Sequence, residues 1–286
     1  MKKKIESKKR LNERLKDLRL PGIRECWEEL IRLATKESMS YESFLSGLLE
    51  RECDLRKTKR IERLLKEARL PLEKSMDNFD LKRLPMKIVQ QTKALLEGGF
   101  LNRNENVLAF GNPGSGKTHL LCGIGQELIR RHEKRVLYVM CGDLVQELLA
   151  AKKSLQLPKK LKKLSRFDAI IIDDIGYVKH DREEMEVLFT LLAHRYERGS
   201  VMITSNLPFS KWETIFKDPV VTAAAIDRLV HHCVILELNV ESFRMAEARK
   251  ANLSQRQAGK IIGKRGGWHN FFMRFSMLSK LQKGRI

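Results

Sequence analysis

A glycine-rich segment, GNPGSGKT at 111–118, has the residue types that bind a phosphate group. It fits the pattern G-x-x-x-x-G-K-[ST], in which glycines let backbone N–H groups curl around a phosphate without Cβ clashes. Lys117 would reach the β- and γ-phosphates, and Thr118 would offer its hydroxyl to Mg²⁺. The predicted nucleotide-binding residues are Gly111, Asn112, Pro113, Gly114, Ser115, Gly116, Lys117, Thr118 and His119. The alternative is an ordinary glycine-rich turn between a strand and a helix.

Two adjacent carboxylates end the most strand-like apolar run, IIIDDIGY at 170–177. Burying an isolated carboxylate is costly, so the pair predicts a positive charge nearby. Beside a phosphate-binding loop, a strand-end aspartate holds Mg²⁺, and we predict Asp173 and Thr118 as metal ligands. Because strand side chains alternate, Asp174 is expected to turn instead toward an attacking water as a general base. The alternative is a solvated Asp-Asp pair in a loop.

Short apolar runs alternate with helical patterns from residue 106 onward. The candidate strands are NVLAF (106–110), RVLYVM (135–140), AIIID (169–173), SVMIT (200–204) and CVILEL (233–238). Strands separated by helices predict an α/β fold in which helices cover both faces of a parallel sheet. The glycine-rich segment follows the first strand and precedes a helix expected over 119–131, as a phosphate-binding loop requires.

The first third of the chain is typical of amphipathic helices. In SYESFLSGLLERE, apolar residues recur with helical spacing at Tyr41, Phe44, Leu45, Leu48 and Leu49. We expect a basic helical interaction domain at 1–78, a nucleotide-binding domain at 79–249 and a basic tail at 250–286. The tail is interpreted as a disordered extension, and the alternative is nucleic-acid binding through its basic and aromatic residues. Trp27 and Trp212 are expected to fill packing positions.

The 286-residue chain has 56 Lys and Arg against 36 Asp and Glu, a formal net charge of +20. Such an excess predicts a polyanionic partner, nucleic acid before membrane. Residues 151–167 hold seven cations and no acid: Lys152, Lys153, Lys159, Lys160, Lys162, Lys163 and Arg166. Phosphate contacts from such a patch release counterions and give salt-sensitive, sequence-independent DNA affinity, so these residues form the predicted DNA-binding set. The alternative is a solvated charged face.

Several classes of protein and site are disfavoured. The start MKKKIESKKR has no apolar region behind its charges, and no run approaches the roughly 18 apolar residues of a membrane span, so no membrane contact is expected. The five cysteines lack CxxC spacing, which favours a reduced cytoplasm over disulfides or a zinc site. His231 and His232 have no carboxylate or further histidine at ligand spacing, so no metal site is predicted there.

Longer motifs surround these residues: LRLPGIRECWEEL, SYESFL, FGNPGSGKTHL, IIIDDIGYVKHDREEMEVLF, ITSNLPFSKWETIFKDPV and AAAIDRLVHHCVILEL. With them, residues 11–249 resemble AAA+ ATPases of the IstB group, bacterial ATP-binding helper proteins of insertion-sequence transposition related to DnaC-type helicase loaders. The resemblance implies a P-loop AAA+ parallel sheet sandwiched by helices, an N-terminal all-helical domain and a truncated or absent lid. Too few residues follow Leu238 for a full lid, so Arg244 receives no predicted role.

The resemblance also implies roles for single residues. Lys117 and Thr118 bind ATP and Mg²⁺, Asp173 is the metal aspartate of the Walker B motif, and Asp174 is the catalytic acid. Position 174 is Asp where most of the superfamily has Glu, which is one methylene longer. Hydrolysis is therefore expected to be slow and stimulated by a partner.

Two further residues complete the implied catalytic set. Asn206 takes the sensor-1 position after the strand SVMIT, where its amide would orient water; otherwise it belongs to an isolated Asn-Leu-Pro turn. Arg228 takes the position of an arginine finger, which would stabilise phosphoryl-transfer charge in a neighbouring subunit and so requires oligomerisation. Its alternative is a local salt bridge to Asp227.

We therefore expect a cytoplasmic ATPase, with ATP and Mg²⁺ as cofactors, that forms a homo-oligomer on double-stranded DNA and assists a transposase in target selection. One alternative is a DnaC-like loader whose partner is a replicative helicase. A second is a P-loop small-molecule kinase, which leaves the net charge of +20 unexplained. A third is a nucleotide-binding scaffold without hydrolysis, which the short acid Asp174 would suit.

Overall fold

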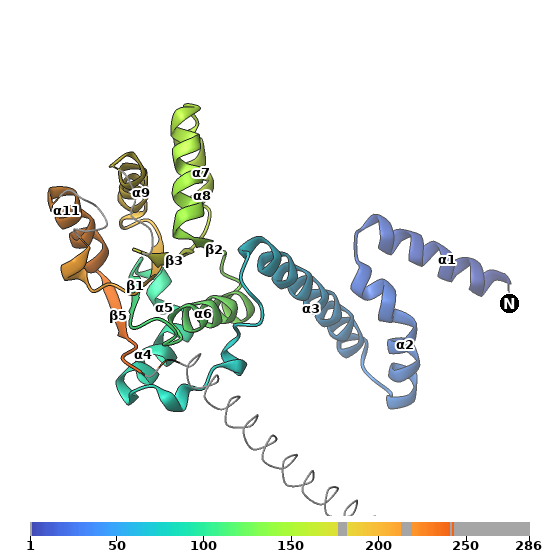
Figure 1. Cartoon of the computed structure of the whole chain (residues 1–286). Helices are drawn as coiled ribbons and strands as arrows, with labels where there is room; N and C mark the ends of the chain where they lie inside the picture. Colours follow the sequence, from blue (N-terminus) through green and yellow to red (C-terminus); the bar gives the residue numbers. More distant parts are fainter. Residues whose placement is uncertain (1, 177–181, 213–218, 241, 243–286) are drawn as a thin grey trace, which may run out of the picture.

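The computed structural model describes residues 2–176, 182–212, 219–240 and 242. The predicted tail at 250–286 and Arg244 lie outside the described residues. Within these ranges, no helix combines the length with the apolar character that crossing a membrane requires. A sheet with its surrounding helices forms the larger part of the molecule, and the N-terminal helices extend away from it (Figure 1).

The sheet has the strand order β2-β3-β4-β1-β5, and its strand pairs are parallel. The strands are β1 (Asn106–Phe110), β2 (Val136–Met140), β3 (Ala169–Ile175), β4 (Ser200–Ser205) and β5 (Cys233–Glu237). The predicted parallel α/β fold is therefore confirmed. Because all strands are parallel, the segments after β1, β3 and β4 meet at one edge of the sheet, with the end of β4 between the other two.

Helices cover both faces of the sheet, because successive strand residues point to opposite sides. Ile170 and Ile172 belong to one buried layer, and Ile171 belongs to the other. The helices of the first layer are α7 (Cys141–Lys153), α8 (Leu157–Leu164), α9 (Arg182–Arg195) and α11 (Pro219–Val230). Those of the second are α4 (Met86–Leu96), α5 (Gly99–Asn102) and α6 (Lys117–His132).

The described part of the chain begins with three helices, α1 (Lys2–Asp17), α2 (Pro21–Glu37) and α3 (Tyr41–Ala68). They share a small buried cluster made of Leu15, Ile23, Trp27 and Leu48. Only part of the predicted stripe at the start of α3 is buried, since Tyr41, Leu45 and Leu49 are exposed. The predicted burial of Trp27 and Trp212 is confirmed.

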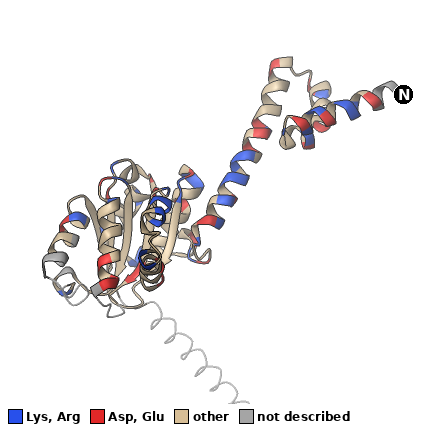
Figure 2. Ribbon diagram, turned by 90° about the horizontal axis from the view of Figure 1, so that it is seen from above, with Lys and Arg blue, Asp and Glu red and all other residues tan. Residues whose placement is uncertain are grey.

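Helix α3 connects this cluster to the sheet. Leu64 and Ala68, in its last turns, pack into the second layer together with Leu70. Residues between 64 and 78, which the sequence analysis assigned to the N-terminal domain, thus contribute to the core around the sheet. An apolar stripe shows that a helix face is buried but not against which partner. Lys and Arg residues gather along the middle of α3, between its two packed ends (Figure 2).

Glu52, a buried carboxylate on α3, fixes the start of α2. It accepts hydrogen bonds from the backbone N–H groups of Gly22 at 2.7 Å and Ile23 at 3.2 Å, and from Arg56 Nε at 2.7 Å. First-turn N–H groups have no partner within their own helix, and the helix dipole favours a negative charge there. A Cβ at Gly22 would lie 2.8 Å from Glu52 Cα, so only glycine permits this approach of α2 to α3.

We predict that Glu52→Gln lowers the free energy of unfolding of the N-terminal helices by about 1–3 kcal/mol at pH 7. Burial by itself raises the pKa of Glu52, but hydrogen bonds from Arg56, Ile23 and Gly22 bring it below the usual 4.5. Because the folded-state pKa is the lower one, the stabilisation is present above pH 4.5 and is lost as the pH falls through the folded-state value.

Amide hydrogen exchange in the first turn of α2, measured at pH 7 and below pH 4.5, tests this prediction. Exchange should accelerate in Glu52→Gln at pH 7, and the difference from wild type should shrink in acid. The matched control is Glu62→Gln, an exposed glutamate on the same helix. An effect of the same size at both pH values would contradict the prediction.

Candidate nucleotide-binding site

The segment at 111–118 connects β1 to α6 and has the backbone shape of a phosphate-binding loop. Gly116 has a φ of +97°, and a Cβ there would lie 3.0 Å from the Phe79 ring. Lys117 is buried, and its Nζ donates hydrogen bonds to the carbonyl groups of Gly111 at 2.7 Å and Asn112 at 3.0 Å. Lys117 is also the first residue of α6, where helix N–H groups favour an anion.

Asp173 joins this segment to the sheet through a carboxylate that is only 4% exposed. Its Oδ1 accepts hydrogen bonds from Thr118 Oγ1 at 2.8 Å and Thr204 Oγ1 at 2.6 Å. Its Oδ2 accepts one from the Tyr138 hydroxyl at 2.8 Å. Burial, and then this hydrogen bond, raises the pKa of Tyr138, so the phenol keeps its proton and donates. The two predicted magnesium ligands, Thr118 and Asp173, are therefore in direct contact.

Asp174 occupies an irregular point in β3. The pairing of β3 with β4 shifts register between Ile172 and Ile175, and Asp174 has a φ of +64°. Its N–H donates to Thr204 Oγ1 at 2.7 Å. A bulge re-aims the side chain, so the simple alternation assumed from the sequence does not describe this position. A positive φ costs a non-glycine residue about 1–2 kcal/mol, and such strain gathers at functional sites.

Asn206 follows β4, the strand that separates the glycine-rich segment from Asp173. Its Oδ1 is buried and has no hydrogen-bond partner among the described residues, and the same holds for Ser115 Oγ. Buried polar atoms normally have partners. An ATP phosphate with its Mg²⁺ and an attacking water offers the hydrogen-bonding groups that these atoms lack. The residues present at this edge of the sheet therefore fit a magnesium nucleotide.

A cavity of about 210 Å³ adjoins the glycine-rich segment. Gly114 to His119 contribute to its lining, as do Phe79, Arg83 and Val240. The ring centroids of Phe79 and His119 are 5.1 Å apart in an edge-on arrangement. An aromatic and an aliphatic side chain beside a phosphate loop suit a nucleotide base. Phe79 belongs to the connector LEKSMDNFDLKRL (72–84), which spans the predicted boundary at 78/79, and its lone phenylalanine was the available signal.

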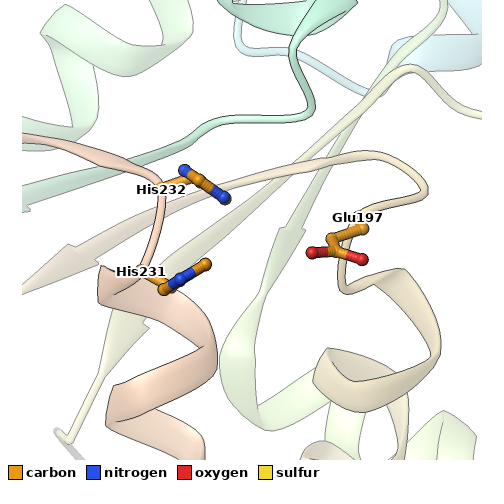
Figure 3. Close-up of side chains that lie close together, drawn as sticks. All are labelled: Glu197, His231 and His232. Carbon is orange, nitrogen blue, oxygen red and sulfur yellow. The ribbon is translucent and has the colours of Figure 1, made fainter.

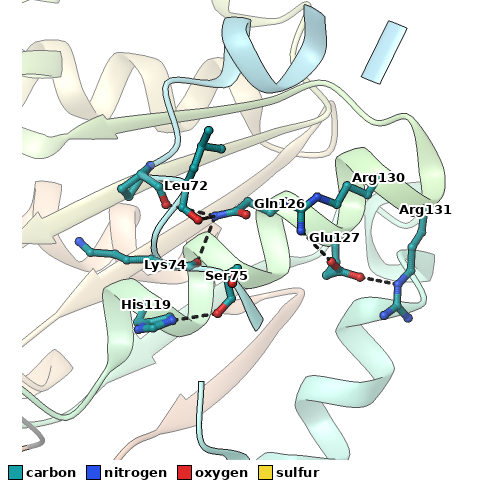
Figure 4. A network of polar contacts seen from close by, with 9 residues as sticks. Leu72, Lys74, Ser75, His119, Gln126, Glu127, Arg130 and Arg131 are labelled. Carbon is teal, nitrogen blue, oxygen red and sulfur yellow. Dashed lines mark hydrogen bonds and ion pairs between the residues drawn. The ribbon is translucent and has the colours of Figure 1, made fainter. Parts of the chain in front are cut away.

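Helix α6 holds this connector in place (Figure 4). Gln126 Nε2 donates to the carbonyl groups of Pro71 at 3.1 Å, Leu72 at 3.4 Å and Lys74 at 3.2 Å. Nε2 of His119 hydrogen-bonds the Ser75 carbonyl at 2.9 Å. The helix that begins at the phosphate-binding loop thus also fixes the segment that leads back to α3.

Arg228 lies at the opposite edge of the sheet. It is near the end of α11, where the adjacent Leu229 carbonyl accepts a hydrogen bond from Asn106 Nδ2 at the start of β1, at 3.2 Å. Its guanidinium lies 4.8 Å from the centroid of the Phe189 ring, and its Nη1 is buried without a hydrogen-bond partner in the described part of the chain. The structure therefore brings Thr118, Asp173 and Asn206 to one edge but not Arg228.

Helix α8 presents part of the basic segment. Leu161 and Leu164 bury its apolar side in the first layer, and Arg195 Nη1 donates to the Leu164 carbonyl at 3.1 Å. Arg195 is itself buried, and this burial lowers its pKa to about 10. The lysines of α8 thus stand on a helix that is fixed to the core.

The fold supplies acids that the basic segment lacks in the sequence. Lys152 pairs with Glu186 at 2.9 Å, and Lys160 pairs with Glu147. An open groove of about 590 Å³ beside α8 is lined by Lys159, Lys160, Lys162, Lys163 and Arg166. The positive charge of this surface is therefore concentrated on the groove side of α8.

The chain was compared with known families and proteins. Residues 13–251 match the family described as IstB-like ATP binding protein. A Sinorhizobium fredii protein named as an insertion sequence ATP-binding protein is 45% identical over 85% of this chain and 81% of its own length. A Geobacillus stearothermophilus protein with the same kind of name is 38% identical over 85% of this chain and 96% of its own length.

Solved structures show the same fold. The DnaC helicase loader has a TM-score of 0.51 at 13% sequence identity, covering 59% of this chain and 97% of that one. AMPPCP-bound DnaA from Aquifex aeolicus also scores 0.51, at 18% identity, covering 65% of this chain and 56% of its own. At these identities the likeness shows a shared α/β fold and nothing about function.

We predict that Gly116→Ala destabilises the protein by about 1–2 kcal/mol, because a side chain at this positive φ is strained. The new Cβ would also press on the Phe79 ring at 3.0 Å, so binding of a fluorescent ATP analogue should weaken. The control is Gly142→Ala on α7, where a Cβ meets nothing within 4 Å and should stabilise the helix by about 0.5–1 kcal/mol. Denaturant unfolding of both variants checks this; wild-type stability in Gly116→Ala would refute it.

Proposed function

This chain belongs to the family of IstB-like ATP-binding proteins, and from that premise we propose that it is an ATPase that assembles on duplex DNA and assists a transposase. The 2.8 Å hydrogen bond between Thr118 and Asp173 supports this function most directly, since it joins the phosphate-binding loop to the acid of β3. The names of the relatives refer to insertion sequences, which favours a transposase as partner. For the helicase-loader alternative, the comparison with DnaC adds a likeness of fold only.

Four residues hold the nucleotide and its ion in this proposal. Lys117 binds the β- and γ-phosphates, while Thr118 and Asp173 provide oxygen ligands for Mg²⁺. Bound there, Mg²⁺ would neutralise charge on the phosphates during phosphoryl transfer. Phe79 borders the cavity beside the loop and would contact the base.

Two residues act on the attacking water. Asp174 takes its proton as a general base, and Asn206 Oδ1 accepts a hydrogen bond that orients it. The Asp174 side chain is shorter than a glutamate, and its backbone is held by Thr204. We therefore propose slow hydrolysis until a partner improves this geometry.

Arg228 acts on the nucleotide of a neighbouring subunit. It lies beside the start of β1, whereas the phosphate-binding loop follows the end of that strand. Five residues at about 3.3 Å each separate the two ends by about 17 Å, which exceeds the reach of an arginine side chain. The same chain therefore does not bring Arg228 to its own γ-phosphate, and ATP hydrolysis requires an oligomer.

Mixing two inactive variants tests hydrolysis between subunits. Arg228→Ala and Asp174→Asn should each lower kcat at least about 100-fold. A mixture should recover part of the wild-type rate, because an Asp174→Asn subunit supplies its arginine to an intact site on an Arg228→Ala subunit. The measurement is ATP turnover against mole fraction, with and without duplex DNA.

The control for the mixing experiment is Asp227→Ala, which should keep wild-type turnover. If the mixture hydrolysed ATP no faster than the sum of the two variants measured separately, action of Arg228 between subunits would be contradicted. Turnover that depends on a metabolite and ignores DNA would favour the small-molecule kinase, and ATP binding without turnover would favour the scaffold.

The groove beside α8 is the DNA-binding surface in this proposal. Lys159, Lys162 and Lys163 have no ion pair in the described part of the chain, whereas Lys152 and Lys160 are paired with acids. Unpaired lysines on a fixed helix are free to neutralise phosphates, and such contacts give affinity without sequence preference. Of the seven residues predicted to bind DNA, the proposal therefore keeps those whose charge is exposed and has no ion pair.

We predict that replacing Lys159, Lys162 and Lys163 with Ala flattens the salt dependence of duplex binding. The slope of log K against log salt should fall by about 0.9 for each phosphate that the variant no longer neutralises. The matched control replaces Lys82, Lys87 and Lys93, three exposed lysines outside this surface. Fluorescence anisotropy over a salt series measures both slopes. If the slope changed equally in the two triple variants, this groove would not be the DNA-binding surface.

A further inference from the structure

Glu197, His231 and His232 come together at the amino edge of the sheet (Figure 3). Glu197 lies in the turn between α9 and β4, and the two histidines lie in the turn between α11 and β5. From the sequence, no metal site is predicted at these histidines, because no carboxylate or further histidine was recognised at ligand spacing. Sequence spacing does not reveal Glu197, because the fold brings its carboxylate to the histidines from another turn.

The three side chains are arranged closely enough to share one ion. One ligand atom from each lies within 4.8 Å of those from the other two. A tetrahedral Zn²⁺ with bonds of about 2.0–2.1 Å holds its ligand atoms about 3.3 Å apart. All three side chains are exposed, so small side-chain rotations bring the ligand atoms from within 4.8 Å to about 3.3 Å of one another without moving core atoms.

Hydrogen bonds from β1 and from the residues just before it hold both turns in position. Asn104 Nδ2 donates to the Glu197 carbonyl at 2.9 Å, and the Asn106 N–H donates to the His232 carbonyl at 2.8 Å. Asn106 begins β1, and Asn104 precedes it by two residues. The backbone of the site is therefore fixed before any ion binds, and preorganised ligands lose less freedom on binding.

Neighbouring side chains suit a metal bound to His231. Its Nδ1 lies 3.2 Å from the Tyr196 hydroxyl oxygen. When Nε2 binds a metal, Nδ1 carries the proton and donates it to that oxygen, which fixes the ring.

We propose that Glu197, His231 and His232 bind a divalent transition metal ion of the Zn²⁺ class, with a fourth position open to water. Two imidazoles and a carboxylate suit Zn²⁺, Ni²⁺ and Cu²⁺, whereas Mg²⁺ prefers oxygen ligands in an octahedral arrangement. The ion would link the α9–β4 turn to the end of α11. Arg228 precedes His231 by three residues, so the ion would also steady the arginine; only this last consequence rests on the proposed function.

Titration of the full-length, chelator-treated protein with Co²⁺ tests the site. We expect one ion per chain, with visible absorption typical of nitrogen and oxygen ligands, that Zn²⁺ displaces and Mg²⁺ does not. Glu197→Gln, His231→Ala and His232→Ala should each weaken binding at least tenfold. The matched control is His194→Ala on α9, which should bind as the wild type does.

Thermal unfolding with chelator first establishes that every variant is folded. Zn²⁺ should then raise the Tm of the wild type and of His194→Ala, but not of the three site variants. Wild-type affinity in those variants, or a sulfur-to-cobalt charge-transfer band from cysteine ligands, would overturn the proposal. Since neither measurement uses ATP, failure here is distinguishable from failure of the proposed ATPase.

Discussion

The buried carboxylate of Asp173 is the constraint on which the nucleotide-binding edge of the sheet depends. A charge that is 4% exposed needs hydrogen bonds in place of water, and Thr118, Thr204 and Tyr138 provide them from α6, β4 and β2. Each donor comes from a different element, so the two carboxylate oxygens of Asp173 fix the positions of α6, β4 and β2 relative to β3. Thr204 also accepts the Asp174 N–H, which ties the strained second acid to the first.

The same edge is connected to the N-terminal helices through α6. Its first turn carries Lys117 and Thr118, and Gln126, two turns later, holds the connector that follows α3. Nearer the middle of α3, Glu52 fixes the start of α2 with a second buried carboxylate. A displacement of α6 would therefore reach α3 through hydrogen bonds rather than through a free linker. In the proposed function, this is the physical route by which the nucleotide affects the N-terminal helices.

Local patterns explain what the sequence predicted well. The five strands and the glycine-rich turn from β1 into α6 were recognisable because each is encoded by contiguous residues. Contacts between distant segments were not recognisable: Tyr138 and Thr204 on Asp173, Phe79 beside the loop, Glu147 paired with Lys160, and Glu197 beside the histidines. The positive φ of Asp174 was missed for a different reason, since a bulge depends on how two strands pair and not on one strand's pattern.

The parallel sheet also explains why assembly and hydrolysis belong together in the proposed function. All carboxyl ends lie at one edge, whereas the end of α11, which carries Arg228 and contacts the start of β1, lies at the other. A site that needs groups from both edges is completed only by a second copy. Because Asp174 is a short and strained base, the completed site would hydrolyse ATP slowly. ATP-bound subunits would then remain together on DNA long enough for a partner to engage, and release would follow hydrolysis rather than precede it.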